Sequence, residues 1–230
     1  MIDVHSHIIF GVDDGSPDLD TSISMVKEMI NIGVTDVICT PHYRINMFET
    51  STQTIKNNFN LLVSKINELG LNINLYLGRE VYYNKNIYNC LDDFKINNQK
   101  IILIEFSYSN NPDIEEVLYN LKRLGFKVII AHIERYSYLN VDDIKQLKSK
   151  NVLIQVNAET ILGRSGFRQK LKVMHLIKNN FIDLIASDIH AERNNYMEKA
   201  YNIIKKKFGA EKANQLFVLN AKTLLNNNGE

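Results

Sequence analysis

The chain has 230 residues, of which 45% are hydrophobic and 23% are charged, as in an ordinary soluble globular protein. Lys and Arg total 27 and Asp and Glu total 26, so the chain lacks the basic excess of a general nucleic-acid binder. We therefore expect no nucleic-acid partner, and a single domain over residues 1–230.

The sequence carries no signal for export or membrane insertion. Its N-terminus lacks a basic segment followed by an apolar one, and no apolar run approaches the length of a membrane span. Cys39 and Cys90 form neither a C-x-x-C pair nor a disulfide framework, which fits a reducing compartment. We expect a cytoplasmic protein that does not insert into a membrane.

Short β-branched segments alternate along the chain with segments of helical periodicity. The predicted strands are Ile2–His5, Asp36–Thr40, Ile73–Gly78, Ile101–Phe106, Lys127–His132, Val152–Asn157 and Ile182–Ser187. The predicted helices are Ser22–Ile32, Ile55–Leu69, Glu115–Leu124, Val141–Lys148 and Leu171–Asn179, with one or two more in residues 196–226. The strands are apolar on both faces, so the pattern predicts an α/β fold of parallel strands joined by helical crossovers.

Residues that bind metals gather where the predicted strands end. Five of the six histidines and four carboxylates lie at or beyond the C-terminal ends of strands, or in the loop after the first one. They are His5, His7, Asp14, His42, Glu80, Glu105, His132, Asp188 and His190. The remaining histidine, His175, lies within a predicted helix. Strand ends meet at one place only if the sheet curls, so we predict a distorted (β/α)7 TIM-like barrel with these residues on one rim.

The spacing of these residues favours a shared site. His5 and His7 are two residues apart, as are Asp188 and His190, so each pair can lie on one face of an extended segment. A single His-x-His pair is weak evidence, because a strand histidine is often a core residue with satisfied hydrogen bonds. Nine such residues on one rim are hard to bury unless cations bind there.

The residue types indicate the kind of metal. Imidazole and carboxylate without thiolate suit Mn, Fe or Zn, and nine ligands are too many for one ion. Three divalent ions beside four carboxylates leave about two positive charges, which would attract an anion such as a phosphate ester. Arg135 follows His132 closely and could bind a phosphoryl group, whereas an exposed ion pair is the alternative. Arg44 and Arg193 lie in rim loops, where ordinary surface positions are the favoured reading.

Other rim residues have more general interpretations. Arg79 has the opposite parity to Glu80, so we expect it to face away from the site. Six aromatic residues could form a wall for a phenyl group, although ordinary packing explains most such residues. They are Tyr43, Phe48, Tyr82, Tyr83, Tyr108 and Tyr136.

Seven segments together resemble the polymerase-and-histidinol-phosphatase (PHP) family. They are Ile2–His7, Val12–Gly15, Thr40–His42, Gly78–Glu80, Ile104–Phe106, Ala131–Arg135 and Ala186–His190. Within that family the chain looks most like the manganese-dependent tyrosine phosphatases of bacterial capsule and exopolysaccharide synthesis. The resemblance extends in order from Met1 to about Leu225.

The resemblance implies a (β/α)7 barrel and a site for three metal ions. One ion would take His5, His7, Glu80 and Asp188. The second would share Glu80 and add Glu105 and His132, and the third would take Asp14, His42 and His190. The implied metal is Mn²⁺, with Fe, Zn or Co as alternatives. Arg135 and Arg193 match arginines near the phosphate in this branch.

The resemblance also implies a reaction. Relatives of this branch remove phosphate from the tyrosines of a partner autokinase of polysaccharide synthesis, and a metal-bound hydroxide would attack phosphorus. Arg135 would stabilise the phosphoryl group, and His42 or Asp188 would assist proton transfer.

Three alternatives remain at this stage. Glu105 stands where other branches often have a histidine, which disfavours a small-molecule role such as histidinol-phosphate phosphatase. A nuclease is disfavoured by the balanced charge, and a non-catalytic phosphotyrosine-binding module by the complete ligand set. A cysteine-based phosphatase is excluded, because Cys39 and Arg44 are one residue too close for a Cys-x5-Arg signature.

Overall fold

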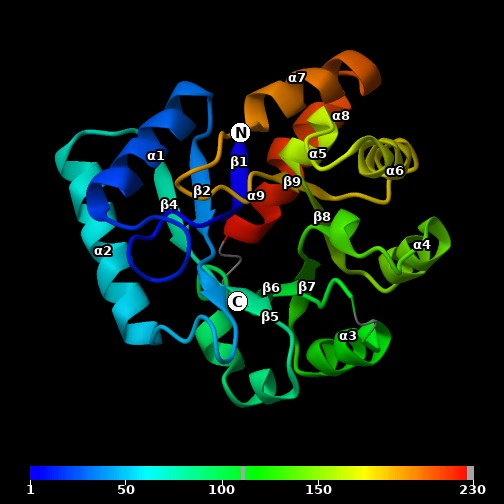
Figure 1. The fold of residues 1–230 in the computed structure, drawn as a ribbon, viewed down its shortest axis with the longest axis horizontal. Coiled ribbons are helices and arrows are strands. Elements are labelled where there is room, and N and C mark those ends of the chain that lie inside the picture. The colour runs from blue at the N-terminus through cyan, green and yellow to red at the C-terminus, as the bar shows by residue number, and fades with distance from the viewer. Residues whose placement is uncertain (110–111, 227–230) are drawn as a thin grey trace.

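The computed structural model describes residues 1–109 and 112–226, and its strands are arranged as the alternation predicts (Figure 1). The strands are β1 Ile2–Ser6, β2 Asp36–Cys39, β3 His42–Tyr43, β4 Asn74–Leu77, β5 Glu80–Tyr82, β6 Ile101–Glu105, β7 Lys127–Ile130, β8 Leu153–Asn157 and β9 Leu184–Ala186. Neighbouring strands pair in parallel, which confirms the predicted fold class. The prediction of one domain over residues 1–230 includes residues outside this description and stays a prediction.

The strands form two sheets rather than one continuous barrel. One sheet has the order β1-β2-β4 and the other β3-β5-β6-β7-β8-β9. The predicted strand that begins at Asp36 is interrupted before Pro41, which cannot donate a ladder hydrogen bond, and it resumes as β3. Hydrogen bonds from Gly78 N–H to Cys39 O (2.9 Å) and from Glu80 N–H to Pro41 O (3.2 Å) connect the two sheets across this break.

The first and last strands meet on the other side of the ring. Ser6 and Ile189 form a parallel bridge, and the Asp188 N–H donates to the His5 carbonyl (2.9 Å). The Asp3 carboxylate also accepts hydrogen bonds from the backbone N–H (3.0 Å) and the hydroxyl (2.5 Å) of Ser187. These contacts bring residues from both ends of the chain to one rim.

Helices surround the strands. They are α1 Leu19–Asn31, α2 Thr52–Glu68, α3 Ile114–Arg123, α4 Val141–Ser149, α5 Ala158–Leu162, α6 Phe167–Lys178, α7 Met197–Phe208, α8 Ala210–Asn214 and α9 Asn220–Leu225. All five predicted central helices are present, with ends shifted by up to four residues. Figure 1 shows α1 and α2 on one side of the strands and α3, α4 and α6 on the other. None of the described helices is both long and apolar enough to span a membrane.

Local signals explain the helix starts. The side chains of Asp18 and Ser51 accept hydrogen bonds from backbone N–H groups in the first turns of α1 and α2. Asn140 and Asp143 form a capping box at α4. Between β5 and β6 the crossover contains only two 3₁₀ helices, Lys85–Asn89 and Leu91–Phe94.

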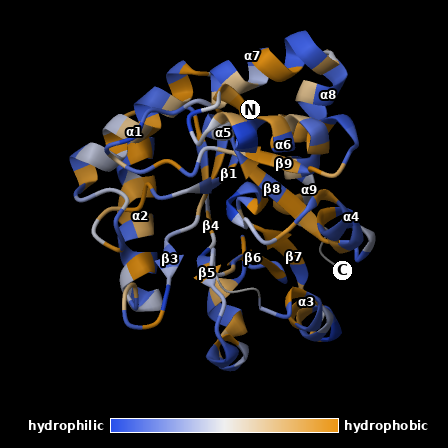
Figure 2. Cartoon of the chain, turned by 45° about the vertical axis from the view of Figure 1, so that its right-hand side comes forward, coloured by the Kyte–Doolittle hydropathy of each residue, from blue (hydrophilic) through white to orange (hydrophobic). Residues whose placement is uncertain are grey.

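The interior of the ring is apolar below the rim. One buried cluster joins residues from β1, β2, β6, β7 and β9 with Ala221 and Leu224 of α9. The side chains of Gln99 and Asn220 hydrogen-bond backbone carbonyls of Leu224 and Asp183, so α9 covers the end of the ring where the strands begin. Figure 2 shows the strands largely hydrophobic and the helices with mixed faces. The buried histidines and carboxylates inside the ring therefore lie at the opposite end, where the strands finish.

Candidate metal centre

The nine predicted ligands come from seven segments of the chain, and the structure brings them to one rim. A register shift between Asp3 and Ser6 adds one residue to β1 relative to β2. This bulge lets Val4 pack in the apolar interior while the next residue, His5, faces the polar rim. His5, His7, Glu80, His132 and Asp188 are all at most 3% exposed.

The most buried group consists of His5, His7, Glu80 and Asp188, which together can offer one ligand atom each to a single ion. Glu80 Oε2 lies 3.1 Å from His5 Nε2 and 3.3 Å from His7 Nε2. Asp188 Oδ1 lies 3.6 Å and 3.5 Å from the same two nitrogens. These four residues are the set that the family resemblance implied for one ion.

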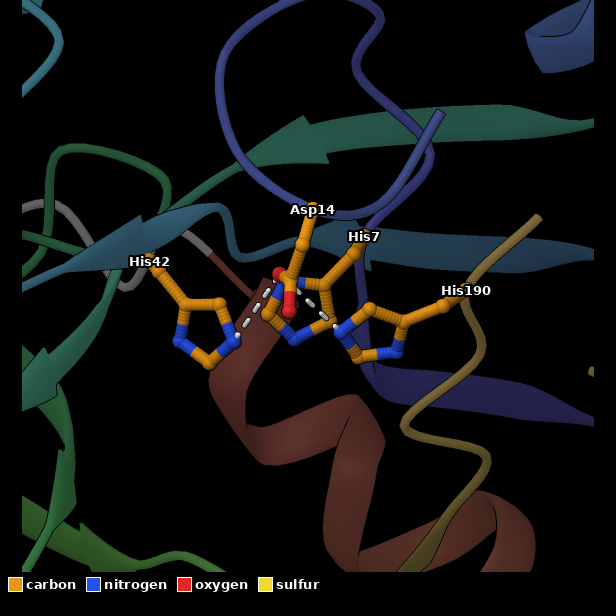
Figure 3. Close-up of side chains that lie close together, drawn as sticks. All are labelled: His7, Asp14, His42 and His190. Carbon is orange, nitrogen blue, oxygen red and sulfur yellow. Dashed lines mark ion pairs between the residues drawn. The ribbon is translucent and has the colours of Figure 1, made fainter. Parts of the chain in front are cut away.

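A second group lies nearer the surface and contains His7, Asp14, His42 and His190. Figure 3 shows Asp14 directed between His42 and His190, with its Oδ1 atom 3.5 Å from Nε2 of each. The His7 and His190 rings stack with their centroids 4.2 Å apart. His7 therefore lies between the two groups, whereas the resemblance implied only the other three residues for this ion.

A third group joins Glu80 and Glu105 with His42. His132 approaches the same carboxylates, with its Nε2 atom 2.8 Å from Glu80 Oε1 and 3.9 Å from Glu105 Oε1. The resemblance implied His132 rather than His42 here. Glu80 contributes to two groups: its Oε1 atom faces His132, and its Oε2 atom also lies 2.9 Å from His42 Nδ1.

Two of these residues have an unusual backbone conformation. His132 has a φ of 29° and Asp188 a φ of 52°, in the left-handed region that few residues other than glycine adopt. Each follows directly or closely on the end of a strand, β7 or β9, so the backbone turns there toward the rim. Strain of this kind is concentrated at functional sites, where the surrounding structure must hold it.

Asp13 supports the centre, although the sequence argument did not assign it a role. Its Oδ2 atom lies 2.8 Å from His7 Nδ1 and accepts a hydrogen bond from the His42 N–H (2.9 Å). A carboxylate on the outer ring nitrogen fixes the tautomer of a metal-binding histidine. The sequence offered one signal for this role, the position of Asp13 beside Asp14 and two residues before Gly15. The alternation of side chains along a strand does not extend into a loop, so it could not predict where Asp13 points.

Gly15 is required by close packing. A Cβ atom at this position would lie 2.1 Å from the His7 carbonyl oxygen and 2.5 Å from the His7 Cβ. The Ser16 N–H donates to the same carbonyl (3.1 Å). The loop that carries Asp13 and Asp14 is therefore folded directly onto the end of the first strand.

Mutual interactions control protonation in the metal-free chain. Burial raises the pKa of Glu80, but the imidazoles of His5 and His42 outweigh it and hold the pKa well below its usual range. Burial also raises the pKa of Asp188, but His5, His7 and Arg135 outweigh this and hold the pKa well below its usual range. Burial and the neighbouring His7 lower the pKa of His190 to about 4.

The arrangement of lone pairs fits divalent cations. Glu80 Oε2 is buried and forms no hydrogen bond among the described residues, although three imidazole nitrogens lie within 3.3 Å of it. His5 Nε2 and His7 Nε2 face each other at 3.2 Å. Converging imidazole nitrogen and carboxylate oxygen atoms are the donor set that Mn, Fe or Zn prefers.

Arg135 lies at the edge of the centre. Its Nη2 atom donates to Asp188 Oδ2 (2.7 Å) and its Nη1 atom to the Tyr108 hydroxyl (3.3 Å). Tyr108 in turn donates to Glu105 through a short hydrogen bond. The sequence indicates only that Tyr108 is one of the aromatic residues of the rim, not that it contacts Arg135 and Glu105.

The other predicted arginines lie in different surroundings. Arg44 is on the rim with its guanidinium 4.2 Å from the centroid of the Tyr82 ring. Arg193 lines a surface cavity of about 480 Å³ together with Asp14 and His190. Arg79 is buried and donates to the backbone carbonyls of Pro41 and His42. It lines a cavity beside α2 and β4 rather than the rim, as its parity indicated.

The aromatic residues of the rim serve mixed purposes. Phe48 stacks on His42 with the ring centroids 5.1 Å apart, so it borders the centre. Tyr136 is fully buried, and its hydroxyl accepts a hydrogen bond from the Phe106 N–H (3.0 Å). It therefore cannot form part of an exposed aromatic wall for a substrate. Tyr43 packs against Phe94 on the outer side.

Comparison with known proteins gives a consistent result. The sequence profile of the family described as "Capsular polysaccharide synthesis, CpsB/CapC" matches residues 1–226. The tyrosine-protein phosphatase CpsB of Streptococcus agalactiae is 35% identical over 240 residues, covering 99% of each chain.

Solved structures are similar as well. A structure from work on YwqE of Bacillus subtilis and CpsB of Streptococcus pneumoniae, described as metal-dependent tyrosine phosphatases, has a TM-score of 0.86 and 27% identity. The matched region covers 93% of this chain and 90% of the solved chain. Histidinol phosphate phosphatase from Lactococcus lactis has a TM-score of 0.60 and 14% identity, covers 94% of each chain, and shows similarity of fold alone.

Proposed function

The chain belongs to the CpsB/CapC family of capsular polysaccharide synthesis, and on this basis we propose that it is a metal-dependent tyrosine-protein phosphatase. The observation that carries the proposal is the convergence of three groups of imidazoles and carboxylates beside Arg135. The similarity to relatives named as tyrosine phosphatases extends over nearly the whole chain and supports the same activity.

The proposed ligands are the nine residues predicted from the sequence. They are His5, His7, Asp14, His42, Glu80, Glu105, His132, Asp188 and His190. Divalent ions bound by them would supply Lewis-acid stabilisation of the phosphoryl oxygens and lower the pKa of water. We propose Mn²⁺ as the native ion, because imidazole and carboxylate ligands without thiolate suit it.

Arg135 would position the phosphoryl group. Its guanidinium is held by Asp188 and Tyr108 at the edge of the centre, and further N–H groups of the same planar fork can bind phosphate oxygens. Phe48 and Tyr108 lie on the same rim and would contact the phenyl ring of the substrate. Arg193 and Arg44 are further candidates for contacts with the phosphopeptide.

The partner in this proposal is a tyrosine autokinase of polysaccharide synthesis. The family description supports a role in that synthesis, and the relatives are named as tyrosine-protein phosphatases, which act on phosphorylated tyrosines of proteins. Cys39 and Cys90 are both free thiols, which supports a reducing compartment such as the cytoplasm.

The test is hydrolysis of a phosphotyrosine peptide by the purified protein, with Mn²⁺ and after treatment with a chelator. We expect Mn²⁺-dependent turnover that exceeds turnover of histidinol phosphate. His132→Ala should lower kcat at least about 100-fold, because it removes a ligand from the ion that Glu80 shares.

His175→Ala is the matched control, since His175 is an exposed residue of α6 remote from the rim. It should retain the full rate. Turnover of the peptide that is absent with every divalent metal, or a clear preference for histidinol phosphate, would disprove the proposed activity.

A further inference from the structure

We propose that Gln155 and Asn157 are positioning residues that set the orientation of three ligands from neighbouring strands. This inference rests on the proposed metal centre. Strand β8 contributes none of the nine proposed ligands, yet both of these side chains are 0% exposed and lie at the centre. They are two residues apart on β8, so both extend toward the interior of the ring.

The two amides form a chain of hydrogen bonds across the base of the centre. Gln155 Oε1 accepts the His132 N–H (2.7 Å) and lies 3.4 Å from His5 Nδ1. Gln155 Nε2 donates to Asn157 Oδ1 (2.7 Å). Asn157 Nδ2 then donates to Asp188 Oδ2 (2.8 Å). One pair of side chains thus connects ligands that follow or lie on β1, β7 and β9.

The direction of this chain has only one consistent solution. A backbone N–H can only donate, so the Gln155 group that faces His132 must be the oxygen. Its NH₂ group then faces Asn157, whose oxygen must accept, and the Asn157 NH₂ group is left to face Asp188. The fixed donor at His132 therefore determines the orientation of both amides.

This direction has consequences for the ligands at both ends. An oxygen beside His5 Nδ1 favours a proton on that nitrogen, which leaves Nε2 free to face Glu80 and Asp188. At the other end, Asp188 Oδ2 accepts from both Asn157 and Arg135. Oδ1 of the same carboxylate then remains for the ion that His5 and His7 share.

Glu134 holds the end of β8 in place through further hydrogen bonds. The backbone N–H of Asn157 donates to Glu134 Oε1 (2.8 Å), and the hydroxyl of Thr160 donates to the same oxygen (3.0 Å). Glu134 is 2% exposed and lies between His132 and Arg135 in sequence. The end of β8 is thereby tied to the segment that carries both of these residues.

The experiment compares divalent metal binding by the full chain and two variants. Gln155→Met removes both amide functions at similar volume. Gln155→Glu keeps the shape and the acceptor for the His132 N–H but cannot donate to Asn157, which would then turn an oxygen toward Asp188. Mn²⁺ affinity is measured by calorimetry, and the absorption spectrum of the Co²⁺-loaded protein reports the geometry of the ligands.

We expect both variants to bind Mn²⁺ about 10- to 100-fold more weakly than the original chain, with altered Co²⁺ spectra. The Gln155→Glu result separates direction from charge, because an added carboxylate acting only by its charge would strengthen binding of a cation. Leu224→Ala is the control for simple loss of stability, since Leu224 is buried in α9 at the end of the ring where the strands begin, opposite the rim. It should keep the original affinity and spectrum.

Unchanged affinity and spectrum in either Gln155 variant would overturn the inference. This outcome is distinct from a failure of the proposed function. If the original chain binds Mn²⁺ and the variants bind it weakly, the inference stands even when no phosphotyrosine is hydrolysed.

Discussion

Individual residues around the ligands determine how well the centre can form, and Asp13 is the clearest case. Its carboxylate lies on the outer nitrogen of His7 and also accepts the His42 N–H, so it orients ligands of two groups. Asp13→Asn removes the negative charge that favours the correct tautomer of His7 and should lower Mn²⁺ affinity about 10- to 100-fold.

This prediction is checked by titrating the metal-free variant with Mn²⁺ in a calorimeter. Asp20→Asn is the control, because Asp20 is an exposed residue in the first turn of α1. Equal affinities for the original chain and Asp13→Asn would show that Asp13 does not orient His7.

Protonation of the histidines makes metal binding depend on pH. Burial lowers the pKa of His5 and of His7, but Glu80 and Asp188 beside His5, and Asp13 beside His7, reverse this, so both pKa values lie above the ordinary value. A raised pKa means that the charged imidazole stabilises the metal-free fold below the unfolded-state pKa, and that this contribution is lost as pH rises through the folded-state pKa. A metal ion needs the neutral ring, so it must displace these protons.

We therefore expect Mn²⁺ affinity to fall as the pH is lowered from about 8 to about 6, with release of protons on binding. Calorimetry in buffers with different ionisation enthalpies measures the number released. Binding without proton release near neutral pH would contradict raised pKa values for both histidines.

At the scale of elements, the loop between β1 and α1 depends on one close approach. Gly15→Ala would place a Cβ atom 2.1 Å from the His7 carbonyl oxygen, so the loop must move away from the strand end. Asp13 and Asp14 would move with it. We expect weaker Mn²⁺ binding and a lower melting temperature of the variant.

Gly33→Ala separates these two effects. Gly33 has a φ of 83° with open space around it, so an added Cβ should cost about 1–2 kcal/mol of stability without reaching the centre. Thermal unfolding and Mn²⁺ titration of both variants provide the comparison. Gly15→Ala with full affinity for Mn²⁺ would argue against the role given to this loop.

For the whole molecule, metal ions should contribute to stability because the centre joins both ends of the chain. Candidate ligands come from β1 at the start and from residues 188–190 near the end, and Ser6 and Ile189 form a bridge between these two segments. A ligand bound only by the folded state stabilises it by RT ln(1 + [L]/Kd), about 2.7 kcal/mol at a concentration of 100 Kd. Chelation should therefore lower the melting temperature, and Mn²⁺ should restore it.

Differential scanning calorimetry with a chelator, followed by addition of Mn²⁺, measures this change. His132→Ala should show a smaller increase on addition of Mn²⁺ than His175→Ala. A melting temperature that is independent of metal in the original chain would mean that the ions do not stabilise the folded state.

Much of this architecture follows from local patterns in the sequence. β-branched segments and periodic helices specified seven strand positions and five central helices, because side-chain periodicity is a local property of each element. The ligand types were also readable, since histidines and carboxylates recur where the strands end. The prediction of one barrel was less accurate in detail, because the strands form two sheets. Pro41 lies between β2 and β3 and Gly78 between β4 and β5, so two neighbouring predicted strands are each divided at the same level.

The tertiary structure decided which residues act together. Periodicity cannot place a loop residue such as Asp13, and it cannot show that the bulge in β1 directs both Val4 and His5 inward. Nor does the sequence of β8 indicate that its amides connect His132 with Asp188. The sequence by itself determined the elements and the donor atoms of the centre, and through-space packing alone decided how those atoms are grouped, because distances and hydrogen-bond directions depend on residues far apart in the chain.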